Sequence, residues 1–216
     1  DYIEKMDGKI YVNAGVDEII TEKGKAIGVR LENGDEVMAP QIISSAGVMN
    51  TFGRFLKSDP QFGMIKKKLQ KVKPTFSYHS LYVGLDKTAA ELNFKNTNLW
   101  IYPGYNHDKN IAKYWKDPAT SELPMVYISF PSAKDPAFSN AHPGVSTMEI
   151  ITAAAPYDEY KKKWGDKPWK KRGDVYENHK KEISHRLLDV AYKYLPQTVL
   201  EILILICEKM IIWDIY

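Results

Sequence analysis

Four side chains in the middle of the sequence are of types that could line a binding cavity for an apolar molecule: His79, Tyr82, Trp100 and Tyr102. His79 lies in a run of aromatic and β-branched residues, so it either faces a substrate cavity or is a hydrogen-bonded structural histidine. The three aromatic residues either line an apolar pocket or belong to the core of a half-buried sheet. The residue types leave both alternatives open and identify no catalytic residue.

The common catalytic and nucleotide-binding signatures do not occur in this sequence. It contains no GxGxxG dinucleotide fingerprint, no Walker A loop, no HExxH and no GxSxG. His179 and His185 share one expected helix, but their spacing makes them project about 240° apart around its axis. They therefore cannot bind one metal ion together, and we expect no metal site.

The first part of the chain is typical of a β-meander. Its short β-branched runs are separated by turn dipeptides with Gly, which tolerates positive φ: Asp7-Gly8, Lys23-Gly24 and Asn33-Gly34. We expect strands at residues 10–12, 16–21, 26–31 and 36–38. The apolar run 41–44 is predicted to be a strand buried on both faces, and Ala46-Gly47 would let the backbone approach a bulky group. An ordinary meander that ends in a loop is the alternative.

From residue 49 onward the pattern predicts helices and longer strands. Apolar residues at helical spacing predict helices at residues 49–58, 64–72, 110–115 and 174–195. Asp174 is the expected N-cap of the last helix, and Pro196 ends it. Aromatic and β-branched runs predict strands at 76–85, 99–102, 125–130 and 147–152. The fold class is therefore α+β, with a mixed or antiparallel sheet that carries helices on one side.

These elements predict three parts of the chain. Residues 1–48 form the meander part, residues 49–197 the sheet domain, and residues 198–216 an Ile-rich apolar tail. Charged residues at Glu201 and Glu208-Lys209 interrupt the tail. No apolar run therefore approaches the roughly 18 residues that indicate a membrane-spanning helix.

Composition and charge narrow the classes of function. Apolar residues make up 44% of the 216 residues, which suffices for a hydrophobic core. The net charge of +3 is too small to indicate nucleic-acid binding. The single cysteine, Cys207, excludes a disulfide framework and fits a reducing compartment such as the cytoplasm. The basic, Trp-containing run 161–172 is either a solvated face or a peripheral contact with an anionic membrane.

Five short motifs follow one another in the second half of the chain: Phe130-Pro-Ser-Ala-Lys-Asp-Pro136, His142-Pro-Gly-Val-Ser-Thr147, Ala155-Pro-Tyr157, Arg172-Gly-Asp-Val-Tyr176 and Tyr194-Leu-Pro-Gln197. Together they resemble the retinol saturases, a family of all-trans-retinol 13,14-reductases within the wider phytoene desaturase group of FAD-dependent oxidoreductases. The opening meander resembles the flavin-domain segment of the whole group. The resemblance covers roughly residues 8–197.

The resemblance implies an FAD-dependent oxidoreductase that acts on a carbon–carbon bond of a polyene or isoprenoid, with NAD(P)H as a candidate electron donor. By similarity, the backbone around Val16 would meet the FAD adenine, and Ser45 and Ala46 would lie beside the dinucleotide. The strands between residues 76 and 152 would wall the substrate cavity. Residues 1–48 would then belong to an FAD-binding domain, and residues 49–197 would form a substrate-binding domain.

Two departures from the family pattern leave a second hypothesis open. The sequence lacks both the Gly-rich phosphate loop of the family and the C-terminal segment that closes over the flavin, and its tail after Gln197 differs. We therefore expect an internal fragment of such an oxidoreductase, which binds FAD weakly or not at all. The alternative is a non-catalytic module that binds an apolar ligand or a protein partner.

Overall fold

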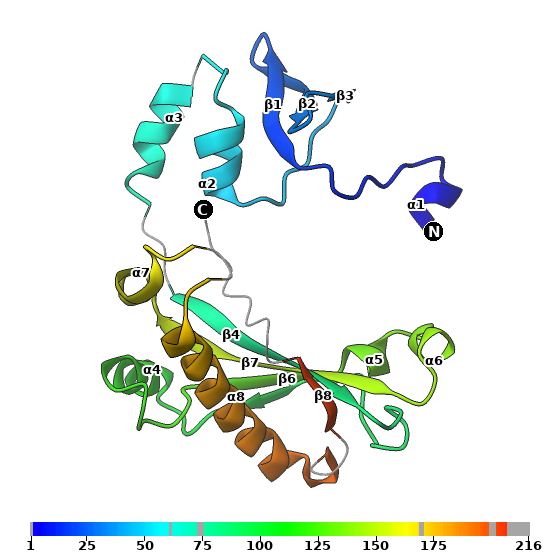
Figure 1. Cartoon of the computed structure of the whole chain (residues 1–216), viewed down its shortest axis with the longest axis vertical. Coiled ribbons are helices and arrows are strands. Elements are labelled where there is room, and N and C mark those ends of the chain that lie inside the picture. Colours follow the sequence, from blue (N-terminus) through cyan, green and yellow to red (C-terminus); the bar gives the residue numbers. More distant parts are fainter. Residues whose placement is uncertain (1, 61, 73–75, 169–170, 199–201, 207–216) are drawn as a thin grey trace. The chain divides into compact units, whose positions relative to one another are not determined.

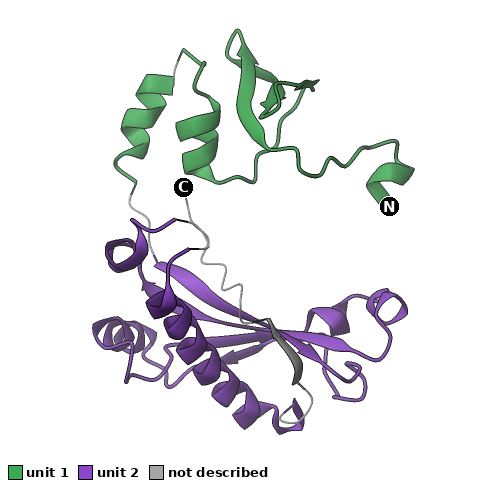
Figure 2. Cartoon of the chain, in the orientation of Figure 1, with its two compact units in different colours: residues 1–74, 215–216 green, residues 75–214 purple. Residues whose placement is uncertain are grey.

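The computed structural model describes residues 2–60, 62–72, 76–168, 171–198 and 202–206. Packing divides the chain into two compact units, which Figure 2 shows in different colours. Unit 1 covers residues 1–74 with 215–216, and unit 2 covers residues 75–214. This division follows packing alone. The boundary predicted at residue 48 separates cofactor from substrate roles, and it stays a prediction.

Unit 1 contains an antiparallel meander. Its strands lie in the order β1-β2-β3 (Figure 1), and they span Val16–Glu22, Lys25–Leu31 and Glu36–Met38. Lys23 and Gly24 have φ angles of 50° and 75° and form the tight turn between β1 and β2, as a type I′ turn requires. The strands predicted at 16–21, 26–31 and 36–38 are present.

Two other runs expected to be strands lie outside this meander. Ile10, Tyr11 and Val12 form no strand and are 57%, 62% and 79% exposed. Residues 41–44 form no strand either, and Ile43 is 96% exposed, so the prediction of a strand buried on both faces is wrong. A strand needs a neighbour that pairs with its main-chain N–H and C=O groups. Within the described residues neither run has such a neighbour.

Short helices complete unit 1. They are α1 (Tyr2–Lys5), α2 (Val48–Asn50), which continues as the π-helical segment η1 (Thr51–Phe55), and α3 (Phe62–Leu69). The helices predicted at 49–58 and 64–72 are thus present with shifted bounds. Among the described residues of this unit, only two apolar side chains, those of Ile19 and Leu69, are buried. Unit 1 therefore has little hydrophobic core of its own.

Unit 2 is built on an antiparallel sheet, which together with its helices makes the fold α+β. The strand order is β5-β6-β7-β4-β8. The strands span Phe76–Leu85 (β4), Leu99–Ile101 (β5), Val126–Ser129 (β6), Ser146–Pro156 (β7) and Ile202–Ile206 (β8). The first four lie where strands were predicted: β4 has the predicted bounds, and β5, β6 and β7 have shifted bounds. β8 falls in the predicted tail, whose residues 199–201 and 207–216 lie outside the described part of the chain.

A long helix covers one face of this sheet. α8 (Asp174–Tyr194) runs across β4, β6 and β7, as Figure 1 shows. Its apolar side chains and those of the strands form one buried core, which includes Leu81, Val83, Ile128, Met148, Ile150, Ile183 and Leu187. The shorter helices of the unit are α4 (His107–Lys116), α5 (Pro131–Lys134), α6 (Phe138–Ala141), α7 (Tyr157–Trp164) and the 3₁₀ turn η2 (Pro196–Thr198). None of the helices in the described part of the chain combines the length and apolar composition needed to cross a membrane.

The start of α8 differs from the prediction that Asp174 is its N-cap. Gly173, with a φ of 82°, is the N-cap, and Asp174 is the first helical residue. The Gly173 carbonyl accepts the backbone N–H groups of Tyr176 and Glu177 at 3.1 Å and 3.2 Å. Positive φ favours Gly because it has no Cβ, so the cap lies one residue earlier. Asp174 remains in the first turn, where its negative charge suits the helix dipole.

The basic run 161–172 points its Trp inward. Trp164 is 7% exposed and packs on Tyr160 and Tyr176 at ring-centroid distances of 5.0 Å and 5.4 Å. The neighbouring residues Lys161–Lys163 are exposed. Trp169 and Lys170 lie outside the described residues. Contact of this run with a membrane stays a prediction.

Candidate functional site

The sheet of unit 2 has one covered face and one open face. Along β4, alternate residues are buried: His79, Leu81 and Val83 are 3%, 1% and 2% exposed. Side chains of successive strand residues point to opposite faces, so Ser80 and Tyr82, which are half-buried, lie on the other face. We call this second face, opposite α8, the open face.

One row of side chains across the open face is mainly aromatic. Trp100 of β5 pairs with Tyr127 of β6, Tyr127 pairs with Ile151 of β7, and Ile151 pairs with Ser80 of β4. The rings of Trp100 and Tyr127 have centroids 4.7 Å apart, and Trp100 is 58% exposed. We call Trp100, Tyr127 and Ile151 the aromatic row. It offers a flat, apolar and accessible surface.

The next row on the same face is polar. Ser129 of β6 pairs with Glu149 of β7, and Glu149 pairs with Tyr82 of β4; we call these three residues the polar row. Lys134 of α5 closes its end, because its Nζ donates to Ser129 Oγ at 2.8 Å and also to Asn98 Oδ1. Burial, and then the charge of Glu149 and a hydrogen bond with it, raise the pKa of the Tyr82 hydroxyl. The Tyr82 hydroxyl therefore keeps its proton, and the strand register places Tyr82 opposite Glu149.

His79 lies on the covered face, away from Tyr82 and Trp100. Its ring centroid is 5.6 Å from that of His179 on α8. Burial is the main cause that lowers the pKa of His79 to about 3, followed by the charges of His179 and Arg186. The geometry favours the structural alternative for this histidine, and its role in a substrate pocket stays a prediction.

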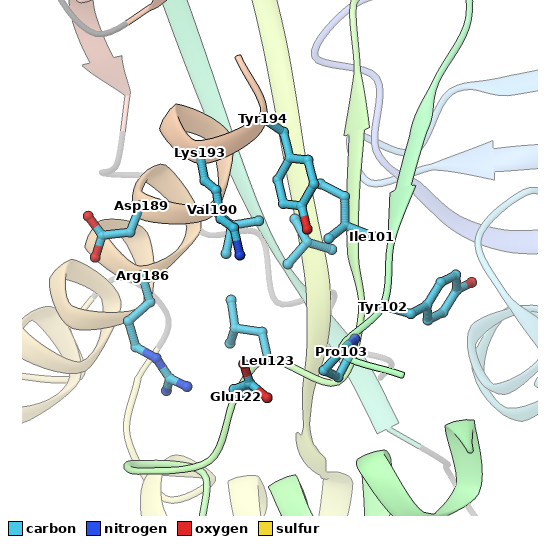
Figure 3. Close-up of a pocket in the computed structure, with 11 residues that line it drawn as sticks. Ile101, Tyr102, Pro103, Glu122, Leu123, Arg186, Asp189, Val190, Lys193 and Tyr194 are labelled. Carbon is cyan, nitrogen blue, oxygen red and sulfur yellow. The ribbon is translucent and has the colours of Figure 1, made fainter. Parts of the chain in front are cut away.

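Tyr102 follows β5 and lies at the rim of a different pocket. This pocket has a volume of about 420 Å³ and is lined by Ile101, Tyr102, Pro103, Glu122, Leu123, Val126, Arg186, Asp189, Val190, Lys193 and Tyr194. In Figure 3 the Tyr102 ring points away from the other side chains. It instead stacks on Trp100, with ring centroids 6.5 Å apart and an interplanar angle of 9°. Tyr102 thus extends the aromatic surface of the open face.

Unit 1 contains a separate hollow that includes one of the three predicted cofactor residues. Its volume is about 500 Å³, and it is lined by Ile19, Ala26, Ile42, Ser44, Ser45, Gly47, Val48, Thr51, Phe52 and Leu56. Ala46 adjoins this lining, and its carbonyl oxygen accepts a hydrogen bond from Asn50 Nδ2 at 3.0 Å. Val16 instead lies at the start of β1, paired with Leu31. The structure thus brings Ser45 and Ala46 together but not Val16.

The chemistry of this hollow fits one part of FAD better than another. Most of its lining is apolar, with hydroxyl groups at Ser44, Ser45 and Thr51, and such a surface suits a flat ring with hydrogen-bonding edges. No lining residue in the described part of the chain carries a charge that could bind the pyrophosphate. The residues present therefore fit the adenine end of the dinucleotide.

Sequence comparisons relate the chain to known proteins over most of its length. It is 35% identical over 206 residues to the inactive all-trans-retinol 13,14-reductase of Danio rerio, and this alignment covers 90% of this chain and 33% of the Danio rerio protein. It is 32% identical over 203 residues to the all-trans-retinol 13,14-reductase of Rattus norvegicus, with the same coverage of 90% and 33%. The chain is a homologue of the all-trans-retinol 13,14-reductases. It spans about a third of the length of these curated relatives.

More distant comparisons agree with this homology. The chain is 31% identical over 143 residues to the phytoene desaturase of Neurospora crassa, and this alignment covers 62% of this chain and 23% of the desaturase. Among solved structures, an oxidoreductase from Methanosarcina mazei matches with a TM-score of 0.50 and 19% identity, over 94% of this chain and 38% of that one. This likeness supports the fold alone. No protein-family model matches the chain.

Several residues of the open face were not singled out in the sequence. Tyr127, Ile151, Glu149, Ser129 and Lys134 join Tyr82 and Trp100 only because of how the strands pair. One signal was present in the sequence, since each strand residue next to a deeply apolar one must face the other way. The pairing register itself is not readable from one sequence.

Proposed function

We propose that this chain contributes the substrate-binding sheet and part of the flavin-binding region of an FAD-dependent oxidoreductase. The enzyme acts on a carbon–carbon bond of a polyene or isoprenoid substrate. The observation that carries this proposal is the aromatic row on a sheet face that α8 leaves open. The homology to the all-trans-retinol 13,14-reductases supports it, because all-trans-retinol is a polyene.

The aromatic row would bind and orient the substrate. A polyene is flat, rigid and apolar, and it gains most from stacking on flat rings and from leaving water. The rings of Trp100, Tyr127 and Tyr102 provide such a surface at the edge of the sheet. By covering one side of the polyene, these side chains would also exclude water from the reacting bond.

The flavin, when bound, supplies the hydride chemistry, and this chain's residues would hold only its adenine end. Ser45 and Ala46 belong to or adjoin the hollow of unit 1, whose lining fits a flat ring. NAD(P)H remains a candidate electron donor by resemblance to the family. A second observation supports a place for unit 1 in a larger flavin-binding region: its apolar side chains at Ile43, Val48 and Phe52 are 96%, 55% and 40% exposed, which is costly in water unless another surface covers them.

Ligand binding by site-directed variants tests the proposal. All-trans-retinol titrated into the full chain should quench tryptophan fluorescence, and Trp100→Ala combined with Tyr127→Ala should weaken binding at least about tenfold, or about 1.4 kcal/mol. Tyr105→Ala is the matched control, because Tyr105 is fully exposed and lies outside both rows. Equal affinity in the double variant and the control would place polyene binding elsewhere.

The non-catalytic alternative makes a different prediction about flavin. A module that only binds an apolar ligand would bind retinol at the open face but would show no affinity for FAD or for AMP. An oxidoreductase segment would bind FAD or AMP through the hollow of unit 1, even if weakly. Equilibrium dialysis with both nucleotides at millimolar concentration separates the two functions.

A further inference from the structure

The open face changes chemistry between two neighbouring rows. The side chains of the aromatic row are apolar or aromatic, and Ser80 of β4 lies next to the row at its Ile151 end. In the polar row, by contrast, Glu149 lies between Ser129 and Tyr82. Residues two apart on a strand are separated by roughly 7 Å along it. A polyene lying on the aromatic row could therefore reach the polar row with one end.

Glu149 supplies the negative charge of the polar row. Ser129 and Tyr82 are neutral, and the Lys134 ammonium keeps its positive charge at the end of the row, where it donates to two neutral oxygens, Ser129 Oγ and Asn98 Oδ1. The half-buried position of Glu149 makes its carboxylate more effective than an exposed one, because the surrounding dielectric is lower. An incoming hydrogen-bond donor would be attracted to this carboxylate, whereas the positive charge of Lys134 at the Ser129 end offsets part of the repulsion that the carboxylate exerts on an anion.

The hydrogen-bonding capacity of Glu149 also favours a ligand that donates a hydrogen bond. A carboxylate offers about four lone-pair positions and donates nothing. The single hydroxyl of Tyr82, which lies opposite on β4, could occupy only one of these positions. A ligand hydroxyl could donate a charge-assisted hydrogen bond to the remainder. A ligand carboxylate could not donate, and a hydrocarbon end would leave the carboxylate desolvated without a partner.

We propose that Glu149 determines substrate specificity on the open face, by selecting a polyene that ends in a hydroxyl over one that ends in a carboxylate or a hydrocarbon. This inference rests on the proposed function, because it assumes that a polyene lies on the aromatic row. Tyr82 acts as a positioning residue, because it lies opposite Glu149 and its hydroxyl can orient the carboxylate. Neither residue needs to take part in the redox step.

A comparison of three ligands on the full chain tests the inference. The ligands are all-trans-retinol, all-trans-retinoic acid and the matching hydrocarbon without the terminal oxygen, and binding is followed by tryptophan quenching. The unmodified chain should prefer the alcohol over the acid by at least about tenfold. Glu149→Gln should weaken alcohol binding about tenfold, tighten acid binding several-fold and leave hydrocarbon binding within about twofold, since about tenfold corresponds to 1.4 kcal/mol.

Two further variants separate specificity from general damage to the sheet. Tyr82→Phe keeps the ring and removes the hydroxyl, so it should weaken alcohol binding about threefold without changing hydrocarbon binding. Glu159→Gln, on an exposed position of α7, is the matched control and should leave all three affinities unchanged. Loss of all three ligands in Glu149→Gln alone, with an altered circular dichroism spectrum, would mean that Glu149 holds the fold and would overturn the inference.

The outcomes distinguish this inference from the proposed function. If the polyenes bind but Glu149→Gln leaves the alcohol-to-acid ratio unchanged, the specificity role is wrong and the proposed function stands. If no polyene binds the unmodified chain, both are wrong. A reversed or abolished preference in Glu149→Gln, with hydrocarbon binding retained, supports both.

Discussion

The imidazole rings of His79 and His179 lie 5.6 Å apart between their centroids, at an interplanar angle of 67°. His79 comes from β4 and is 3% exposed, while His179 comes from α8 and also packs on Trp164 at 5.1 Å. Burial, then His179 and Arg186, lowers the pKa of His79 to about 3. Burial also lowers the pKa of His179, although Glu182 opposes this effect. The folded chain therefore favours neutral forms of both histidines.

We expect this pair to make the fold sensitive to acid. In the unfolded chain a histidine binds its proton near pH 6.5, whereas folded His79 stays neutral until about pH 3, so the unfolded state binds more protons between these values. The free energy of unfolding should fall as the pH falls through this window, by at most about 1.4 kcal/mol per pH unit for His79. Urea unfolding at several pH values measures the slope.

Variants identify the source of this slope. His79→Gln removes the buried titrating group and should flatten the pH dependence. His185→Gln changes an exposed histidine of α8 and should leave the slope as it is. The same slope in all three proteins would assign acid sensitivity to other groups.

The aromatic cluster of α7 and α8 should contribute strongly to stability. Trp164 is 7% exposed and contacts Tyr160, Tyr176 and His179. Trp164→Ala would leave a large cavity, and such changes typically cost about 3–5 kcal/mol. The neighbouring exposed Lys162→Ala should change the free energy of unfolding by no more than about 0.5 kcal/mol. Comparable chemical-denaturation midpoints for the two variants would argue against this packing.

A side-chain hydroxyl adds a hydrogen bond between β7 and the residue that precedes β6. Thr152 is fully buried, and its Oγ1 donates to the Met125 carbonyl at 2.6 Å. Thr152→Val keeps the shape but leaves that carbonyl without this donor, so we expect a loss of about 1–3 kcal/mol. Thr152→Ser, which retains the hydroxyl, should be the less damaging change. The reverse ranking in urea unfolding would show that the methyl group, rather than the hydrogen bond, matters here.

The hollow of unit 1 can be closed by one substitution. Ala26 lines it, so Ala26→Phe would fill space that we assign to the adenine ring. Binding of FAD or AMP should weaken at least about tenfold, as measured by equilibrium dialysis. Lys25→Ala, at an exposed neighbouring position, is the control. Equal nucleotide affinity in Ala26→Phe and the control would move the dinucleotide away from this hollow.

The elements that could be predicted from the sequence are those with strong local patterns. β4 was predicted with its observed bounds because Phe76–Leu85 is rich in aromatic and β-branched residues. The strand predicted at 41–44 failed because an apolar run becomes a strand only with a pairing partner. β8 was missed because Ile202–Ile206 was interpreted as part of a tail, and nothing local indicates that it pairs with β4.

The candidate site was only half predictable, for a related reason. Tyr82 and Trp100 were chosen for their residue types, and both lie on the open face. Glu149 and Tyr127 were not chosen, because their place beside those residues depends on the register of three strand pairs. His79 has the same residue-type appeal as Tyr82, but the two-residue periodicity of β4 puts it on the covered face.

The Lys134 ammonium bridges Asn98, which precedes β5, and Ser129, which ends β6. β5 is only three residues long and forms the edge of the sheet, so few ladder hydrogen bonds hold it in place. The Lys134 ammonium therefore restrains the segment that carries Trp100, because it hydrogen-bonds next to β5 and at the end of β6. The rigidity of the stacking surface would then depend on an amine that lies outside the aromatic row. Amide hydrogen exchange at β5 would report how strongly these hydrogen bonds protect the strand against local opening.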